Sequence, residues 1–378
     1  MKIAYVTTYD ATDPNAWSGS GHYMYHALIQ AGFEVEVIGG LKNKFNLLFS
    51  AKKLVLKFIF GKNYLKDREP VIVKNYARQL ENRLGSTEYD LVFSPSSIPL
   101  AYLSVDKPMV FWTDATFAGM IDFYPDFSNF SKQTLRMGNQ MEQLALDKCK
   151  YVVYSSEWAA KTATDHYKVT PAKIKVVPFG ANIPSAGYPT PAEKVLEAKE
   201  AGKIKLLFIA VDWYRKGGDK VLEIAEYIND KGHACELHIV GCQPPQKTGP
   251  MVFSHGFLNK SNPGDLAKLK SLFESSHFFL LPTRADCVPV VLAESCAYGL
   301  PCITTNVGGI TSAIQEGLNG YTFDVNADVS LYANKIIDVY NDPGQYKTLV
   351  ENTLKQYEER LNWHSAGQAL KEILTSKV

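Results

Sequence analysis

Short apolar segments alternate with amphipathic ones along the whole chain. In the first half, apolar segments of strand length lie at 2–9, 33–40, 89–96, 108–115, 151–156 and 173–180. Helical patterns at 21–31 and 130–149 separate some of them. Nearly continuous apolar strands that alternate with helices are typical of a parallel sheet covered on both faces. The pattern therefore predicts a doubly wound α/β domain.

A second series of the same kind follows, with strand-like segments at 204–211, 235–241, 276–283 and 301–307. The stretch 182–194 between the two series is rich in Pro and Ala and predicts a linker, and 342–378 reads as helical. We therefore expect two Rossmann-like domains, at 1–183 and 184–361, and a closing helix at 362–378 that returns to the first domain. In such sheets ligands bind at the carboxyl ends of the strands, here in a cleft between the domains.

Composition excludes several classes of protein. The chain has 378 residues, with 40 Lys and Arg against 39 Asp and Glu, and this balance argues against a nucleic-acid partner. The six cysteines form no C-x-x-C motif, so we expect reduced thiols in a cytoplasmic protein. The amino-terminal segment turns polar after six positions, which predicts a strand rather than a signal peptide. No apolar run approaches the roughly 20 residues of a membrane span.

The most informative segment is 284–301. It places Asp286 in a loop after a buried strand, and Glu294 inside a short helix that Pro289 begins and Gly299 ends. The N-terminus of such a helix binds anions because its first N–H groups have no intrahelical partner. Two carboxylates beside an anion site suit a ligand that is part phosphate and part polyol.

This segment resembles the signature of glycosyltransferase family 4, a retaining family with the GT-B fold of two Rossmann-like domains. The signature has two glutamates with seven residues between them, followed by a helix of small residues and Gly-Leu-Pro. Here the two acids are Asp286 and Glu294, and Gly-Leu-Pro ends at Pro301. The departure is Asp286, which keeps the charge of the first glutamate and shortens its reach by one methylene.

The resemblance implies a role for each residue of the segment. Asp286 would bond the hydroxyls of the transferred sugar, and Glu294 would hold the ribose hydroxyls of the donor. The backbone N–H groups of Val290 and Val291 would bind the donor diphosphate. No side chain is assigned as the base, because in this family the leaving phosphate is thought to take the acceptor proton.

Other landmarks of the family follow in order along the chain. Gly19 and Gly21 resemble the glycine-rich loop beside the diphosphate, although an ordinary strand-to-helix turn explains them equally. Arg215 and Lys216 resemble the basic loop that neutralises the diphosphate, the alternative being two solvated surface cations. Leu258 resembles the apolar residue that receives the base. Later turns at 306–309 and 316–323 and the tryptophan segment 362–367 complete the series.

Asp114 and the pair His22 and His26 are further candidates. Asp114 follows an apolar strand and is predicted either to lie near the reacting sugar or to cap a helix. His22 and His26 are spaced to share one helix face, but no third ligand is near them in sequence, so a packing or acceptor-site role is predicted. The chain has no Asp-x-Asp triplet, so we expect a donor site without a metal ion.

The resemblance implies a hexosyltransferase that uses a nucleoside-diphosphate sugar, with UDP as the default base, and needs no cofactor because the sugar nucleotide is a co-substrate. Two alternatives share the fold: a sugar-nucleotide 2-epimerase and a non-catalytic subunit that binds sugar nucleotides. A dinucleotide dehydrogenase is disfavoured because no G-x-G-x-x-G follows the first strand.

The segment from Val37 to Lys66 is unusual, because it holds seven lysines and neither Asp nor Glu around a strongly apolar middle. One interpretation is a domain helix with a solvated basic edge. The other is a surface element that binds anionic lipid or a lipid-linked acceptor. The second predicts a protein peripheral to the inner membrane face, acting in surface polysaccharide assembly.

Overall fold

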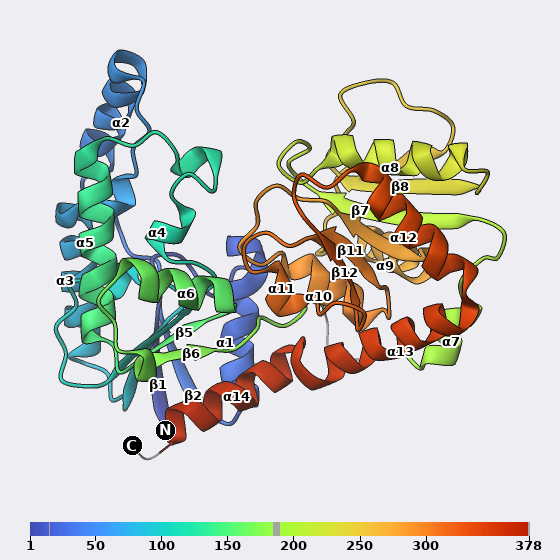
Figure 1. The fold of residues 1–378 in the computed structure, drawn as a ribbon. Helices are drawn as coiled ribbons and strands as arrows, with labels where there is room; N and C mark the ends of the chain where they lie inside the picture. Colours follow the sequence, from blue (N-terminus) through green and yellow to red (C-terminus); the bar gives the residue numbers. More distant parts are fainter. Residues whose placement is uncertain (15, 184–189, 377–378) are drawn as a thin grey trace. The chain divides into compact units, whose positions relative to one another are not determined.

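The computed structural model describes residues 1–14, 16–183 and 190–376. The chain divides into two compact units, one formed by Met1–Pro178 with Ala366–Val378 and the other by Phe179–Ser365 (Figure 1). The predicted linker 182–194 and the predicted boundary after residue 183 fall on a stretch that includes 184–189, which lies outside the described residues. Each unit is described by itself below.

The first unit is built on a six-stranded sheet of order β2-β1-β3-β4-β5-β6, and all its pairs are parallel. Its strands confirm the predicted series: β1 (Lys2–Val6), β2 (Glu34–Ile38), β3 (Leu91–Ser94), β4 (Met109–Thr113), β5 (Tyr151–Tyr154) and β6 (Ile174–Val176). Large side chains from these strands, such as Tyr5, Phe93 and Trp112, are fully buried. The Trp112 indole donates to the Val177 carbonyl at 3.0 Å, so its one polar atom is satisfied.

Helices cover both faces of this sheet, with α1 on one side and α3 and α5 on the other (Figure 1). Their bounds are α1 (Ser20–Gln30), α2 (Asn46–Phe60), α3 (Pro70–Leu84), α4 (Phe117–Met120), α5 (Lys132–Lys148) and α6 (Glu157–His166). Short 3-10 turns lie at Ala16–Gly19, Lys66–Arg68, Ile98–Leu100, Pro125–Phe127 and Pro171–Lys173. The predicted helices at 21–31 and 130–149 correspond to α1 and α5.

The second unit has another six-stranded parallel sheet, of order β12-β11-β10-β7-β8-β9. Its strands are β7 (Ile204–Ala210), β8 (Cys235–Gly241), β9 (Val252–Ser254), β10 (Phe278–Leu281), β11 (Cys302–Thr305) and β12 (Gly320–Phe323). Strand order reverses between β7 and β10, and the carboxyl ends of the strands at such a reversal are a common ligand site. The edge strands β9 and β12 were not predicted, because the first is short and partly exposed and the second lies in a glycine-rich segment.

The helices of the second unit are α7 (Ala192–Glu197), α8 (Gly218–Asp230), α9 (Pro263–Ser275), α10 (Val290–Ala297), α11 (Ile310–Ala313), α12 (Val329–Asn341) and α13 (Pro343–Arg360). The last helix, α14 (Trp363–Thr375), begins in the second unit, and from Ala366 onward its residues belong to the first. A methyl group at Gly367 would lie 2.7 Å from the Ala27 carbonyl oxygen, so only glycine allows this approach to α1.

Among the residues that the structure describes, no helix is both long enough and apolar enough to cross a bilayer.

The loops after β7 and β10 are joined by backbone hydrogen bonds. Arg284 N donates to Arg215 O at 2.8 Å, and the Thr283 hydroxyl donates to the same oxygen at 3.1 Å. Gly217 has φ +79° and lies so close to the Pro282 carbonyl that an added Cβ would overlap it. This glycine therefore serves both the left-handed turn before α8 and the contact between the two loops.

We expect Gly217→Ala to destabilise the second unit more than Gly202→Ala does. Both positions have positive φ, but Gly202 (φ +88°) has no atom within 4 Å of its added Cβ. The control should cost about 1–2 kcal/mol for the left-handed backbone alone, which lowers Tm by roughly 2–8 °C in a unit of this size. Calorimetry should show a clearly larger loss for Gly217→Ala, and equal losses would mean that the loop contact is not required.

Candidate active site

The charged residues of the two joined loops meet at one point. The Lys216 ammonium pairs with Asp286 Oδ2, and Arg215 Nη1 lies 3.9 Å from the same oxygen. Asp286 is only 7% exposed, so its carboxylate needs these cations as partners. The structure thus brings together three residues that the sequence placed on different parts of the donor, and their formal charges leave one positive charge in excess.

Arg215 is fixed by more than its charge. Its guanidinium donates to the Ala285 carbonyl at 2.9 Å, its backbone N–H donates to Asp212 Oδ1 at 3.0 Å, and its Nε lies 3.4 Å from Asp212 Oδ2. A side chain with these partners is rigid, and it braces the loop that carries Asp286. Arg215 therefore positions the site in addition to contributing a cation.

A second arginine, not singled out from the sequence, locks the same two loops from outside. Arg284 donates to both oxygens of Asp219, at 2.8 and 2.6 Å, and to the Tyr214 carbonyl at 2.5 Å. These bonds to Arg284 hold the pKa of Asp219 below its usual range. Bidentate geometry of this kind fixes orientation as well as charge.

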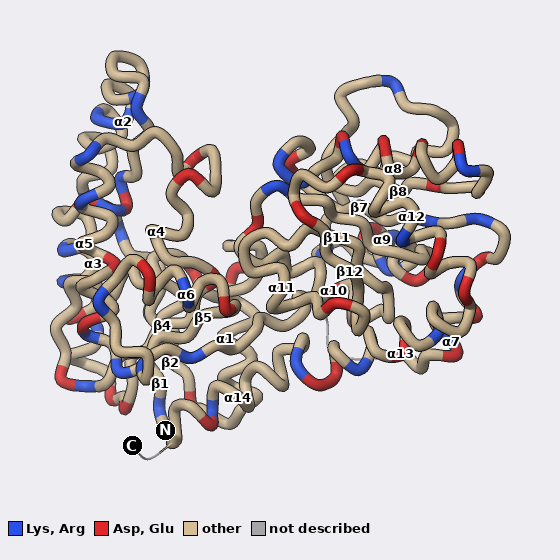
Figure 2. Tube along the Cα trace, viewed as in Figure 1, with Lys and Arg blue, Asp and Glu red and all other residues tan. Residues whose placement is uncertain are grey.

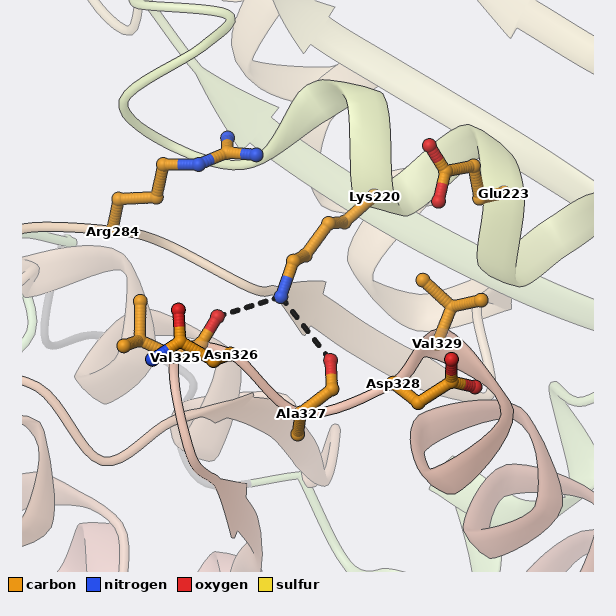
Figure 3. A pocket seen from close by; sticks show the side chains of 8 residues that line it. All are labelled: Lys220, Glu223, Arg284, Val325, Asn326, Ala327, Asp328 and Val329. Carbon is orange, nitrogen blue, oxygen red and sulfur yellow. Dashed lines mark hydrogen bonds between the residues drawn. The ribbon is translucent and has the colours of Figure 1, made fainter.

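A pocket of about 520 Å³ adjoins Arg284 and is lined further by Lys220, Glu223 and the segment 325–329 (Figure 3). The Lys220 ammonium donates to the carbonyls of Val325 and Ala327, at 2.6 and 3.3 Å. Both cations of the pocket are thus committed to protein oxygens, and we assign the pocket no chemistry.

The second acid of the signature is also buried and paired. Glu294 is 4% exposed within α10, and its Oε1 pairs with the Lys260 ammonium. Lys260 donates as well to the Asn182 carbonyl at 3.3 Å, and the Asn182 side-chain oxygen accepts from the Trp363 indole at 2.9 Å. Sequence reasoning missed Lys260. The apolar sequence around Glu294 could have indicated a cationic partner, because a buried glutamate is rarely found without one.

Helix α10 begins at Val290, one residue after the predicted start, and Pro289 is its N-cap residue. Val290 and Val291 therefore occupy the first turn, whose N–H groups lack intrahelical partners and can bind an anion. The loop before the helix is held by Gly309, whose N–H donates to the Cys287 carbonyl at 2.7 Å. The turn predicted at 306–309 thus supports the signature segment directly.

The segment predicted to receive the base follows the edge strand β9. Leu258 is partly buried and packs against the core of the second unit. The segment is anchored by His255 N donating to Ile239 O and by Gly241 N donating to Gly256 O, both at 2.8 Å. The His255 ring contacts His238 at 3.1 Å, and burial together with His255 lowers the pKa of His238 to about 4. His238 is therefore neutral at pH 7.

In the first unit, the predicted glycine loop leads from β1 into α1. Gly19 is the N-cap residue of α1 and has φ +85°, which favours glycine. At Gly21 an added Cβ would overlap the Tyr9 hydroxyl, and the Tyr5 hydroxyl donates to the Gly21 carbonyl at 2.9 Å. The close approach that Gly21 allows in the structure is that of Tyr9, so the phosphate role of both glycines stays a prediction.

Asp114 directly follows β4 and is half-buried. The interpretation of Asp114 as a helix cap is wrong, because α4 is capped by Thr116, whose Oγ1 accepts from Gly119 N at 3.0 Å. The His22 and His26 rings lie 4.4 Å apart, and burial, with a contribution from His22, lowers the pKa of His26. Within the described ranges no three His, Cys, Asp or Glu side chains form a group that could hold a metal ion.

Two family models match consecutive parts of the chain. "Glycosyltransferase Family 4" matches residues 21–183, and "Glycosyl transferases group 1" matches residues 191–356. The two matches together span most of the sequence. The charged residues Lys216, Asp286 and Glu294 lie within the second match.

Curated relatives are distant and differ in length. A sucrose synthase of Denitrovibrio acetiphilus is 32% identical over 89 residues, which is 22% of this chain and only 11% of that protein. Spore coat protein SA of Bacillus subtilis is 23% identical over 358 residues, covering 86% of this chain and 91% of that protein. These matches show ancestry without showing which sugar or acceptor is used.

The fold has solved counterparts. The structure of Anabaena Alr3699/HepE in complex with UDP and glucose superposes with a TM-score of 0.64 at 16% identity and covers all of both chains. This likeness extends over both units described here and identifies the fold as GT-B. From the two matching models and the signature around Asp286 and Glu294, we conclude that this chain belongs to the family 4 (group 1) glycosyltransferases.

Proposed function

We propose that the protein transfers a hexosyl unit from a nucleoside-diphosphate sugar to an acceptor hydroxyl, with retention at the anomeric carbon and without a metal ion. The observation that carries this proposal is the buried Lys216–Asp286 pair beside the first turn of α10. It combines a cation for phosphate, a carboxylate for sugar hydroxyls and free helical N–H groups. UDP is the proposed nucleotide, since a protein of the same fold binds UDP with glucose.

Phosphate is bound in this proposal by three kinds of positive group. The N–H groups of Val290 and Val291 donate to diphosphate oxygens, and Lys216 and Arg215 neutralise the charge that grows on the leaving phosphate. Lys216 then shifts from Asp286 towards the diphosphate. The carboxylate it leaves accepts hydrogen bonds from the sugar instead, so it stays satisfied. Fixed donors of this kind stabilise the transition state more than the ground state.

The nucleoside is held on the other side of α10. Glu294 accepts hydrogen bonds from the two ribose hydroxyls, Lys260 keeps that carboxylate charged and oriented, and Leu258 packs against the base. Because Glu294 is nearly inaccessible, its hydroxyl partners are recognised in a site from which water is excluded.

The chemical step exchanges one bond at the anomeric carbon for another. The bond to the diphosphate oxygen breaks, the bond to the acceptor oxygen forms on the same face, and the acceptor proton passes to the departing diphosphate. Roles for Asp114 near the reacting sugar and for Gly19 and Gly21 near the diphosphate stay predictions from the family resemblance.

The acceptor is proposed to be a lipid-linked glycan reached at the cytoplasmic face of a membrane, as in surface polysaccharide assembly. What supports this is the basic, apolar segment from Val37 to Lys66. The test of the whole proposal is acceptor-dependent release of UDP from UDP-hexoses by the purified protein. Release of an epimer without acceptor would instead identify a 2-epimerase, and binding without any turnover would identify a non-catalytic subunit.

Asp286→Asn should lower kcat by about 100- to 1,000-fold, the effect of losing one polar contact to the transition state. The same variant should bind UDP at least as tightly as the native protein, because Lys216 no longer has a carboxylate to compete with phosphate. Turnover kinetics and titration calorimetry separate the two effects. Native turnover in the variant would remove Asp286 from the mechanism.

Lys216→Ala should weaken UDP binding by about 10- to 100-fold, the usual loss for a charge-assisted hydrogen bond. Lys220→Ala is the matched control, since Lys220 lies four residues later, in the first turn of α8, and bonds protein carbonyls. The control should lower Tm without changing the affinity measured by calorimetry. If both variants bind UDP equally well, Lys216 is not a phosphate ligand.

Lys260→Met should destabilise the second unit by about 1–2 kcal/mol, because it strands the buried charge of Glu294 while Lys260 itself is partly solvated. Adding Glu294→Gln should recover part of that loss. The control Lys270→Met breaks the exposed Lys270–Glu274 pair on α9 and should cost no more than about 0.5 kcal/mol. Additive losses in the double variant, measured by denaturant unfolding, would mean that the two residues are not coupled.

A further inference from the structure

Helix α2 is attached to the first unit along one narrow face. Phe49 on this face is buried in the core, and Leu56 packs against the same core. Between them Lys52 forms an ion pair with Glu69, whose carboxylate also accepts from the Tyr64 hydroxyl. These contacts fix the orientation of α2 on the unit, so the opposite face of the helix is turned away from the protein.

That opposite face is strongly apolar. Leu47 is 88% exposed and Phe58 is 79% exposed, and the other members of the stripe are also exposed: Leu48, Leu54, Val55 and Ile59. Their spacings of three, four, seven and eight residues place them on one side of an α-helix. Single exposed apolar residues are ordinary, but a contiguous stripe of them marks an interaction surface.

The charge around the stripe has one sign. Lys53 and Lys57 are exposed on α2, four residues apart, and Lys42 and Lys44 are exposed just before it. In Figure 2 the charged positions of α2 are all basic, in keeping with a segment from Val37 to Lys66 that has no acidic residue. An apolar stripe with lysines at its edge is complementary to a surface that is apolar below and anionic above.

A second copy of the chain fits this surface poorly. Two α2 helices packed stripe to stripe would bring the lysines of both copies together, and residues 37–66 supply no acid to offset their repulsion. A bilayer with anionic headgroups offers hydrocarbon for the stripe and phosphate for the lysines at the same time.

We propose that α2 docks the first unit on an anionic membrane surface, with Leu47, Leu54 and Phe58 inserted below the headgroups and Lys53 and Lys57 on lipid phosphates. Docking of this kind would bring the protein to the lipid-linked acceptor of the proposed function, and the inference rests on that proposed function. Vesicle binding and UDP release are measured separately, so either can fail while the other holds.

The first experiment is sedimentation of the full chain with vesicles of phosphatidylglycerol and phosphatidylcholine, and with vesicles of phosphatidylcholine alone. We expect binding to the anionic vesicles and a marked loss of binding at about 0.5 M NaCl, where surface charge is screened. Absence of binding to the anionic vesicles overturns the proposal. Equal binding to both kinds of vesicle overturns the role of the lysines.

Two variants test the two parts of the surface. Phe58→Gln with Ile59→Gln should weaken binding by at least about 100-fold, whereas Leu331→Gln, at an exposed position of α12, should not weaken it. Lys53→Gln with Lys57→Gln should weaken binding by about 30-fold. Its charge-matched control is Lys347→Gln with Lys355→Gln on α13, which should bind as the native chain does. If either control variant loses as much vesicle affinity as the corresponding α2 variant, α2 is not the docking element.

Insertion itself is read from a tryptophan introduced into the stripe. The emission of Phe58→Trp should shift to the blue on addition of anionic vesicles, whereas that of Leu331→Trp should not move. A dimer at the same protein concentration in the absence of lipid, abolished by Phe58→Gln, would overturn the proposal in favour of a second copy. Turnover of a water-soluble acceptor by the α2 variants should stay at the native level.

Discussion

The candidate active site depends on the contact between the loops that follow β7 and β10. These strands are neighbours in space although α8, β8, β9 and α9 separate them in sequence, so the contact exists only when the sheet has formed. Gly217 allows the approach and the Arg284–Arg215 backbone bond maintains it. Lys216 and Asp286 are presented to each other as a consequence. Strand order thus fixes the placement of the charged groups, and the side chains only complete it.

A second constraint comes from burying carboxylates. Asp286 and Glu294 are both nearly inaccessible, and an isolated charge at such depth would be expelled by its own desolvation cost. Each acid is therefore matched by one lysine from a different loop. Arg215 and Arg284 use their planar groups differently, to tie loops together through carbonyls and Asp219. In this site each lysine neutralises one buried acid, whereas the arginines hold the loops in place.

Much of this architecture was predictable from the sequence. The apolar segments 204–211 and 276–283 contain the mostly buried strand β7 and the buried strand β10, and their composition and length indicated strands. The start of α10 followed from Pro289, and the acids followed from the family signature. The features that were not predicted from the sequence depend on tertiary contacts. The strands β9 and β12 are held at sheet edges by pairing with a neighbour rather than by their own composition. Lys260 meets Glu294 across 34 residues of sequence, a distance at which no spacing rule applies. Asp114 was a predicted cap of α4, but Thr116 is the residue that caps it. Both residue types favour the cap position, and the path of the backbone decides which of the two occupies it.

The pairing of each buried acid with a lysine also limits how the sequence can change. A substitution that removes one partner leaves the other as an unbalanced buried charge, which destabilises the fold. A single substitution is therefore unfavourable even where replacing both members of the pair would be tolerated. Asp286 is one methylene shorter than the glutamate of the family signature, and the long side chain of Lys216 reaches its carboxylate. Substitutions at positions 216 and 286, or at positions 260 and 294, should therefore be made as pairs, so that no buried charge is left without its partner.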